Sequence, residues 1–330
     1  MSSLDEHLPD DDMSRFFTGT HEVLHCLEGE GEFNLHENMK TCKKNPDHTG
    51  FIPVNLFKPE HLPLEFRDED IFNLTKALVN VTVRIAVKFT SLERPEFIQG
   101  TKDQYPGYDM RGKNSQRTGT GRVMEVRKYA EGMQFFPYTP CPCPECELSG
   151  IPSKVWFQVL VLTAKHVVYD DSEACTSKCR LWFDEEKCPV VNIIGWKLNS
   201  FGFQRDISMF FCVTHDIDVG EKLSGMVWGF MNLCTEICMK YKSRKDADKL
   251  TIIVSHPHGF AKQVSVGHWV HKDKSDHKNT RYTYTNCTCP GSSGAMVYRL
   301  GLLAGTTNHP HSGTNSSGLN YSGFAFEVNV

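Results

Sequence analysis

Short apolar runs separated by turn residues make up the chain from about residue 79 to its end. Within 79–90, β-branched and other apolar residues alternate with polar or small ones, and this period of two predicts a half-buried strand. Comparable runs, bounded by Gly, Pro, Asp and Asn, predict strands at 121–127, 156–163, 180–183, 190–194, 207–213, 226–229, 250–255, 263–269, 282–285, 295–298, 302–306 and 323–328. Many short strands without an internal repeat are typical of an all-β sandwich or a pair of barrels.

Helical patterns are few. Residues 68–79 predict one short helix, and Cys234 and Cys238 fit a short helix or a strand. The charged segment 239–249 predicts a solvated surface loop, and the Gly- and Asp-rich segment 100–120 predicts a connection. Residues 1 to about 65 are polar and weakly periodic, which indicates a partly ordered extension that packs on something else.

Composition and charge exclude several classes of protein. The chain has 330 residues, a formal charge of −4 and a calculated pI of about 6.4, as in a soluble globular protein. No basic run interleaves with aromatic residues, so a nucleic-acid partner is not indicated, and no apolar run approaches a membrane span. The acidic N-terminus lacks a signal-peptide pattern, so we expect a cytoplasmic protein, secreted only if the chain is a processed form.

Thirteen cysteines are a high count for such a chain. Without a secretion signal, free thiols or metal ligands are favoured over a disulfide framework. Cys141, Cys143 and Cys146 lie within six residues beside two prolines, a spacing that suits structural zinc, with Cys179 or else Cys175 as the fourth ligand. Reduced thiols in a loop, or a disulfide in a secreted chain, are the alternatives.

Three separate segments carry candidate catalytic side chains. Ser293 lies in a tight Gly-Ser-Ser-Gly turn, where the N–H groups of Gly291 and Ser293 would form an oxyanion hole. His166 follows a strand of apolar residues, and Asp206 immediately precedes another, so that a histidine Nδ1–H could donate to it. Taken singly, these residues are better explained as a common Gly/Ser turn, a packed or surface histidine and a turn aspartate.

Together the three segments resemble the trypsin/chymotrypsin-like serine peptidases. Thr163-Ala164-Lys165-His166, Arg205-Asp206-Ile207-Ser208 and Pro290-Gly291-Ser292-Ser293-Gly294-Ala295 are similar to that family's three motifs and follow its order. The segments 117–123 and 255–267 are similar to further strands of the fold, in the style of intracellular or bacterial-type branches. The resemblance covers roughly residues 80–330.

The resemblance implies an all-β fold of two six-stranded antiparallel Greek-key β-barrels. Residues 1–80 would be an N-terminal extension and 81–330 the protease domain, with a first barrel at about 81–215 and a second at about 216–330. The site between the barrels would be a serine endopeptidase centre of His166, Asp206 and Ser293, acting on protein or peptide substrates without a cofactor. The family's six-residue offset places Cys287 near the floor of the substrate pocket, with His309 or His311 in its wall as candidate partners of an acidic side chain.

The sequence departs from the family pattern at positions beside the expected catalytic residues. Ser292 replaces the usual Asp before the nucleophile, so activation by a freed N-terminus is not expected. Lys165 beside the histidine is expected to face solvent. The rival interpretations are a catalytically silent protease-fold binding module and a zinc-centred interaction protein; a cysteine peptidase on the same fold would require Cys at 293, where the sequence has Ser.

Overall fold

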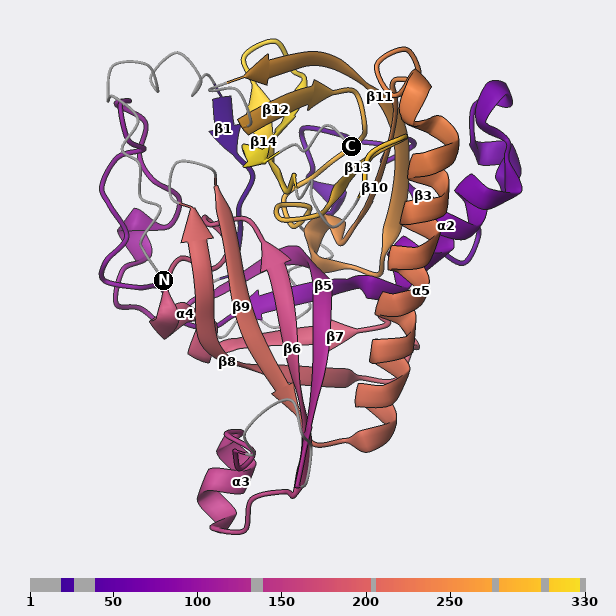
Figure 1. Ribbon diagram of the computed structural model, residues 1–330. Coiled ribbons are helices and arrows are strands. Elements are labelled where there is room, and N and C mark those ends of the chain that lie inside the picture. The colour runs from indigo at the N-terminus through magenta and orange to yellow at the C-terminus, as the bar shows by residue number, and fades with distance from the viewer. Residues whose placement is uncertain are drawn as a thin grey trace.

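The first β unit is a closed antiparallel barrel. The computed structural model describes residues 19–26, 39–131, 139–202, 206–274, 279–303 and 309–326. Six strands pair in the order β5-β4-β7-β8-β9-β6, and a β5–β6 pairing closes the ring (Figure 1). They are β4 (Thr82–Val87), β5 (Gln116–Ala130), β6 (Val155–Thr163), β7 (Ser177–Leu181), β8 (Val191–Gly202) and β9 (Ile207–Thr214).

The second β unit contains the strands after residue 249. Its path is β13-β10-β11-β12-β15-β14, and hydrogen bonds that join Ala295 and Val297 to His311 and His309 connect the two ends. The strands are β10 (Leu250–Ser255), β11 (Gln263–Lys274), β12 (Asn279–Tyr284), β13 (Val297–Arg299), β14 (His311–Asn315) and β15 (Asn320–Ser322), with the two-residue β16 (Ala325–Phe326) beside β12. The expected fold class, mostly β with a double barrel of the trypsin-like type, is confirmed.

Short strands near the N-terminus join both units. β1 (Gly19–His21) pairs with β14 and β3 (Ile52–Pro53) pairs with β11, whereas β2 (Leu24–Cys26) pairs with β5. Residues 19–26 therefore leave the second unit and enter the first, and Figure 1 shows β1 beside β14. Because each short strand completes a ladder of hydrogen bonds, this part of the extension belongs to the sheets.

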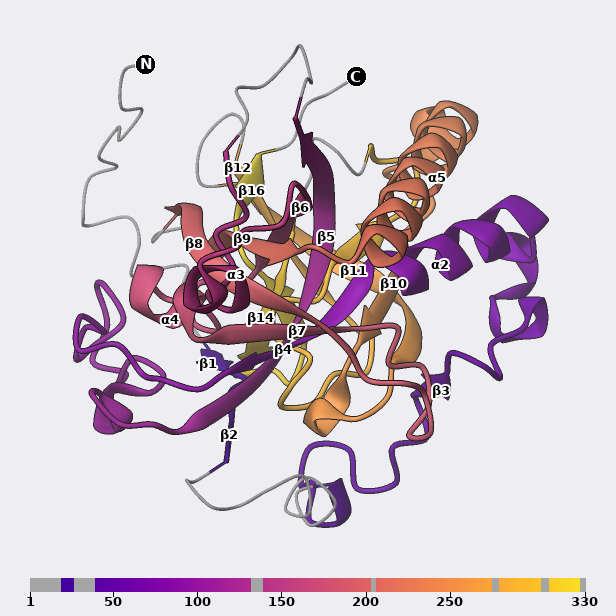
Figure 2. The ribbon, with the colours of Figure 1, turned by 90° about the horizontal axis from the view of Figure 1, so that it is seen from below.

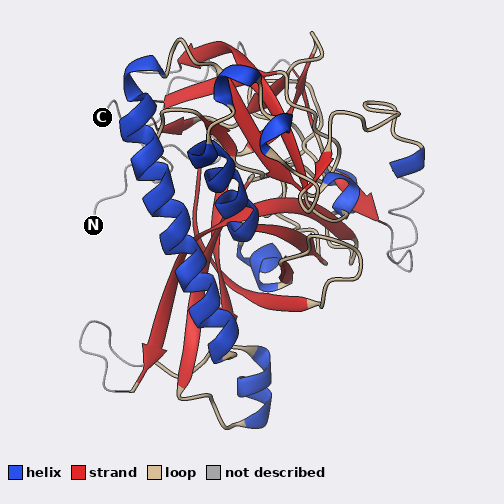
Figure 3. Ribbon diagram, turned by 90° about the vertical axis from the view of Figure 1, so that its right-hand side faces the viewer, coloured by secondary structure: helices blue, strands red, loops and turns tan. Residues whose placement is uncertain are grey.

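Two longer helices lie side by side along the flank of the barrels. α2 (Glu69–Val81) begins at Asp68, whose side chain accepts from the Asp70 N–H, and α5 (Ile217–Tyr241) begins at Asp216, which caps the Val219 N–H. Lys240 of α5 forms ion pairs with Asp68 and Asp70. Figures 2 and 3 show the two helices together, with α5 running past both β units. The short helices are α3 (Pro144–Ser149), α4 (Asp171–Cys175), η2 (Pro59–His61), η3 (Leu64–Phe66), η4 (Tyr108–Met110), η5 (Lys242–Arg244) and η6 (Pro257–Gly259).

Helix α5 overturns three sequence-based expectations. The strand predicted at 226–229 is wrong, the short element around Cys234 and Cys238 is part of a 25-residue helix, and the predicted loop 239–249 begins inside it. Its buried residues recur every three or four positions: Gly220, Leu223, Val227, Phe230, Cys234, Ile237, Cys238 and Tyr241. That spacing is helical, but the interior glycines Gly225 and Gly229 obscured it, because glycine disfavours helices. No helix in the described ranges is long and apolar enough to cross a membrane.

Other predicted boundaries shift by a few residues. The strand predicted at 79–90 begins only at Thr82, because Val79 and Val81 complete the apolar face of α2. Leu302 lies in a turn, and residues 304–306 of the strand predicted there are outside the described residues. Of the strand predicted at 323–328, only Ala325–Phe326 forms, and residues 327 and 328 are likewise outside them.

Glycines within α5 give a matched test of its packing. A Cβ at Gly225 would meet nothing within 4 Å, whereas a Cβ at Gly220 would lie 2.3 Å from the Phe157 ring. We expect Gly225→Ala to raise the free energy of unfolding by about 0.5–1 kcal/mol, because alanine loses less backbone entropy in a helix. Gly220→Ala should lower it by about 1–3 kcal/mol through overpacking. Chemical denaturation of both variants checks this, and a stabilising Gly220→Ala would contradict the packing described.

Candidate active site

His166 and Asp206 form a buried pair between the two β units. His166 Nδ1 donates to Asp206 Oδ2 over 2.8 Å, and the His166 N–H donates to Asp206 Oδ1 over 3.1 Å. Burial of Asp206 would raise its pKa, but the neighbouring histidines and hydrogen bonds hold that pKa well below its usual range. The imidazole is therefore fixed in one orientation, and its buried Nε2 has no hydrogen-bond partner among the described residues.

Each member of the pair is positioned by its own surroundings. Asp206 has a positive φ of 52°, which turns the chain just before β9, and its Oδ2 accepts from Ser312 Oγ of β14 over 2.6 Å. Arg205 of the predicted motif lies outside the described residues. The carbonyl oxygen of His166 accepts from the Arg94 guanidinium over 3.1 Å. Both barrels thus contribute to the orientation of the pair.

Arg94 belongs to a buried ion cluster that sequence reasoning missed. The Glu173 carboxylate of α4 forms ion pairs with Arg94 Nε and Arg117 Nη2, each over 2.7 Å. All three side chains are almost fully buried. Charge neutralisation makes this burial tolerable, because an unpaired buried carboxylate costs several kcal/mol. The three residues are 23 and 56 positions apart, so their spacing in the sequence carries no local pattern.

The Ser293 turn is built against the first barrel. Gly291 and Gly294 have φ values of 98° and 86°, and a Cβ at Gly294 would lie 2.1 Å from Thr163 Oγ1. Thr120 of β5 donates its N–H to the Ser293 carbonyl oxygen and its hydroxyl to the Gly291 carbonyl oxygen, both over 2.8 Å. In the described residues, the N–H groups of Gly291 and Ser293 have no hydrogen-bond acceptor. The turn therefore offers two free donors next to a serine hydroxyl.

Ser293 Oγ is not hydrogen-bonded to His166. Its hydroxyl donates to the main-chain carbonyl oxygen of Glu22, and no hydrogen bond from Ser293 to His166 Nε2 is present among the described residues. The preceding residue, His21, stacks on the His166 ring with centroids 4.6 Å apart. One dipeptide thus contacts both expected catalytic side chains.

Residues 19–26 cross this site as an extended strand. On one side β1 pairs antiparallel with β14, with His21 opposite Gly313, and the Glu22 N–H donates to the Ser312 carbonyl oxygen over 3.3 Å. On the other side β2 pairs with β5, with Leu24 opposite Thr118. Between the two ladders, the Glu22–Val23 peptide bond lies at Ser293.

The Glu22 carboxylate enters a polar pocket and is 7% exposed. It pairs with Lys44, accepts from Thr314 Oγ1 over 2.5 Å and lies 3.2 Å from His311 Nε2. Burial alone would raise the pKa of this carboxyl, but His311 and Lys44 lower it well below its usual range. Burial lowers the pKa of His311, and its Nδ1 lies 2.6 Å from the Tyr284 hydroxyl, which itself donates to the Tyr321 carbonyl oxygen over 3.1 Å.

The structure separates the predicted pocket residues. His311 contacts the Glu22 carboxylate, whereas His309 faces Thr280, with its Nε2 3.0 Å from the threonine hydroxyl. Cys287 lies against Gly50, and within the described residues no hydrogen bond joins Cys287 to Glu22. Lys44, from the N-terminal extension, was missed because nothing in its local sequence marks it as a pocket residue.

Lys165 corrects an expectation. It was expected to face solvent, but it is 2% exposed, and its ammonium lies 4.3 Å from the centre of the Tyr169 ring. Burial lowers its pKa to about 8. Ser292, next to Ser293, packs in the interior, and its Oγ lies 3.1 Å from Ser255 Oγ.

Two cysteine–histidine clusters lie outside this centre. Cys141, Cys143 and Cys146 meet His215, with ligand atoms within 4.8 Å of one another. The expected fourth residue, Cys179, instead lies 3.7 Å from Cys212, and Cys175 donates to the Trp196 carbonyl oxygen, so the side chain that the structure brings to the three cysteines is His215. The reason is topological: β9 ends beside the cysteine insertion, whereas β7 lies across the barrel.

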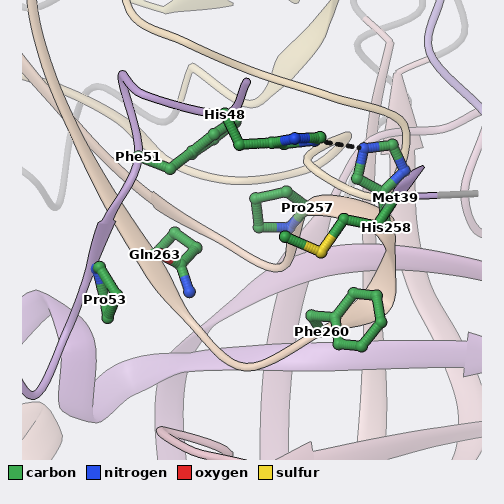
Figure 4. A pocket seen from close by; sticks show the side chains of 8 residues that line it. All are labelled: Met39, His48, Phe51, Pro53, Pro257, His258, Phe260 and Gln263. Atoms are coloured by element: carbon green, nitrogen blue, oxygen red, sulfur yellow. Dashed lines mark hydrogen bonds between the residues drawn. The ribbon is translucent and has the colours of Figure 1, made fainter. Parts of the chain in front are cut away.

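The second cluster was not anticipated. Cys42, His48, His258 and Cys289 also have ligand atoms within 4.8 Å of one another. Figure 4 shows His48 and His258 facing each other above an open pocket. The pocket is lined by Met39, His48, Phe51, Pro53, Pro257, His258, Phe260 and Gln263.

Comparisons with known proteins give distant likenesses only. No protein-family model matches the sequence, and no curated protein matches it. Among solved structures the chain is similar to the HtrA-type protease AlgW with a tripeptide, at TM-score 0.37 and 12% identity, over 76% of this chain and 58% of AlgW. It is also similar to Deg5, at TM-score 0.37 and 11% identity, over 79% of this chain and 90% of Deg5. A third similar structure is the active form of the Rv3671c protease from M. tuberculosis, at TM-score 0.38 and 11% identity, over 79% of this chain and 82% of that protease. The proposed function therefore rests on the geometry of the site.

Buried histidines predict an acid-sensitive fold. Burial lowers the pKa of His21 to about 4, so between pH 6.5 and 4 the unfolded chain binds more protons than the folded one, and stability falls as the pH falls. For His21 alone we expect a loss of about 2 kcal/mol between pH 7.5 and 5, measured by denaturation of the Ser293→Ala chain. His21→Gln in that background should flatten the profile over this range; an unchanged slope would contradict the assignment.

Proposed function

We propose that the chain is a serine endopeptidase that hydrolyses peptide bonds through His166, Asp206 and Ser293. The observation that carries the proposal is the buried His166 ring, oriented by Asp206 through Nδ1 and with its Nε2 unpaired among the described residues, near the point where Ser293 Oγ meets a peptide carbonyl group.

The geometry supports a general-base mechanism. His166 Nε2 takes the proton of Ser293 Oγ as the oxygen attacks the substrate carbonyl carbon, and the Asp206 carboxylate stabilises the imidazolium that forms. Approach of Oγ to Nε2 accompanies the attack, since catalytic hydrogen bonds often tighten only along the reaction path.

As Ser293 attacks, negative charge develops on the substrate carbonyl oxygen, and hydrogen-bond donors that are already in position stabilise it. The N–H groups of Gly291 and Ser293 are candidates, because the turn leaves both without acceptors in the described residues. The imidazolium then protonates the leaving amine, and water hydrolyses the acyl-enzyme with His166 as base. The substrate would be a protein or peptide strand that pairs with β14, as residues 19–21 do.

Labelling of Ser293 tests this function. We expect a fluorophosphonate to label the full chain on Ser293, and Ser293→Ala to lose both the label and casein hydrolysis, the latter by at least about 10³-fold. Ser292→Ala is the matched control, because its hydroxyl contacts Ser255 and not Glu22, and it should keep the label. Labelling that survives in Ser293→Ala, or the absence of labelling in folded wild type and in folded Glu22→Ala alike, would favour the silent binding module instead.

A further inference from the structure

The pocket around the Glu22 side chain has the properties of a carboxylate receptor. Lys44, Thr314 and His311 direct their donors to the carboxylate, and Thr288 Oγ1 lies 3.5 Å away. Lys44 Nζ also donates to Thr288 Oγ1 and to Asn320 Oδ1, both over 2.7 Å, which fixes the ammonium beside the carboxylate. His311 is fully buried and Lys44 and Thr314 are partly buried, so without a negative charge these donors would lose their common acceptor.

The main chain of the same segment is held on both sides of Ser293. Residues 19–21 pair with β14 and residues 24–26 pair with β5, so the Glu22–Val23 peptide bond lies between the two ladders, next to Ser293. The Glu22 carbonyl oxygen accepts from the Ser293 hydroxyl, which lies beside two N–H groups without acceptors among the described residues.

We propose that residues 19–26 are the active site's own substrate, that the chain cleaves its Glu22–Val23 bond, and that the site selects glutamate on the amino side of the cleaved bond. This inference rests on the proposed serine endopeptidase function and adds its specificity. Aspartate, one methylene shorter, would fall short of Lys44 and His311, and glutamine would leave the Lys44 charge uncompensated.

The reaction balances as an ordinary hydrolysis. Ser293 Oγ bonds to the Glu22 carbonyl carbon and loses its proton to His166, and the carbon–nitrogen bond to Val23 breaks as that proton passes to the Val23 nitrogen. Water then cleaves the Glu22 ester, which restores the Ser293 hydroxyl and leaves a carboxylate on Glu22 and an amine on Val23.

Intact mass and N-terminal sequencing of the purified full chain test self-cleavage. We expect wild type to yield a chain that begins at Val23, Ser293→Ala to stay whole, and Glu22→Gln to slow cleavage about 10²-fold. Glu65→Gln, at an exposed glutamate, is the matched control and should cleave as wild type does.

Peptides separate specificity from self-cleavage. A peptide of residues 19–26 with Glu at the fourth position should be cleaved with a kcat/KM about 10²-fold above its Gln and Lys analogues. Lys44→Met should reduce that preference, whereas Lys102→Met, at an exposed lysine, should not.

The outcomes distinguish the two proposals. If Ser293 takes the fluorophosphonate but the chain stays whole, or cleaves peptides without preference for Glu, the inference is overturned and the peptidase function stands. If Glu22→Ala raises labelling while wild type stays whole, the segment is an inhibitor and not a substrate. If neither labelling nor cleavage occurs in any folded variant, the peptidase function itself fails.

A separate observation concerns the two cysteine–histidine clusters. Zinc–ligand bond lengths imply tetrahedron edges of about 3.8 Å between sulfurs, about 3.4 Å between nitrogens and about 3.6 Å for mixed pairs. At the first cluster His215 Nδ1 lies 3.4 Å from Cys143 Sγ and 3.6 Å from Cys146 Sγ. At the second, Cys42 and Cys289 have sulfurs 3.6 Å apart, and the Nε2 atoms of His48 and His258 are 3.1 Å apart.

We infer that each cluster binds one structural zinc ion, with ligands Cys141, Cys143, Cys146 and His215 at one site and Cys42, His48, His258 and Cys289 at the other. Four protein ligands close each site, which is typical of structural and not catalytic zinc. The first site would fix the insertion between β5 and β6. The second would fasten the N-terminal extension to the segment that leads to Ser293.

Elemental analysis of the full chain tests this inference. We expect two zinc ions per chain, about one in Cys143→Ser and in Cys42→Ser, and two in Cys212→Ser, a buried cysteine outside both sites. Because a ligand variant can misfold, cobalt(II) titration of wild type gives a second measurement: two equivalents should give the visible absorption of tetrahedral thiolate sites. A chain without bound metal, a Cys42–Cys289 disulfide in the native protein, or metal content unaffected by both ligand variants would overturn it.

Discussion

Neutralisation of buried carboxylates is the constraint on which the arrangement of this protein depends. Asp206, Glu173 and Glu22 are all buried, and a buried carboxylate is tolerated only with charged or hydrogen-bonding partners. The partners come from distant parts of the chain: His166 and Ser312 for Asp206, Arg94 and Arg117 for Glu173, Lys44 and His311 for Glu22. Each carboxylate therefore fixes the relative positions of segments that the sheets alone would leave independent.

This constraint explains what the sequence could and could not predict. Strands such as β6 and β10 follow from local runs of apolar residues, and the expected catalytic residues stand in short motifs with a recognisable order. Ion partners such as Arg94 and Lys44 have no local signature, because long-range packing alone decides which charge meets which. Helix α5 was missed for a different reason: its helical period was present, but two glycines lowered the weight of that pattern.

The same distinction applies to the metal-ligand candidates. Cys141, Cys143 and Cys146 are close in sequence and could be grouped from spacing alone, whereas His215 joins them only through the β6–β9 pairing. The cluster of Cys42, His48, His258 and Cys289 joins the extension to the Ser293 turn across more than 200 residues of chain. Since Lys44 lies between Cys42 and His48, the second cluster also determines where the positive charge of the pocket stands.

The β1–β14 ladder has a consequence for control of the site over time. If the site is the proposed peptidase centre, residues 19–22 would compete with other substrates as a tethered ligand while the Glu22–Val23 bond is intact, at an effective concentration set by the chain and not by the solution. Cleavage of that bond would make the piece before Val23 an ordinary dissociable ligand, held by three residue pairs of β-ladder and one carboxylate. Occupancy of the site by that piece would then fall as the protein is diluted. A single irreversible cleavage would therefore convert a site whose occupancy is independent of protein concentration into one whose occupancy depends on it.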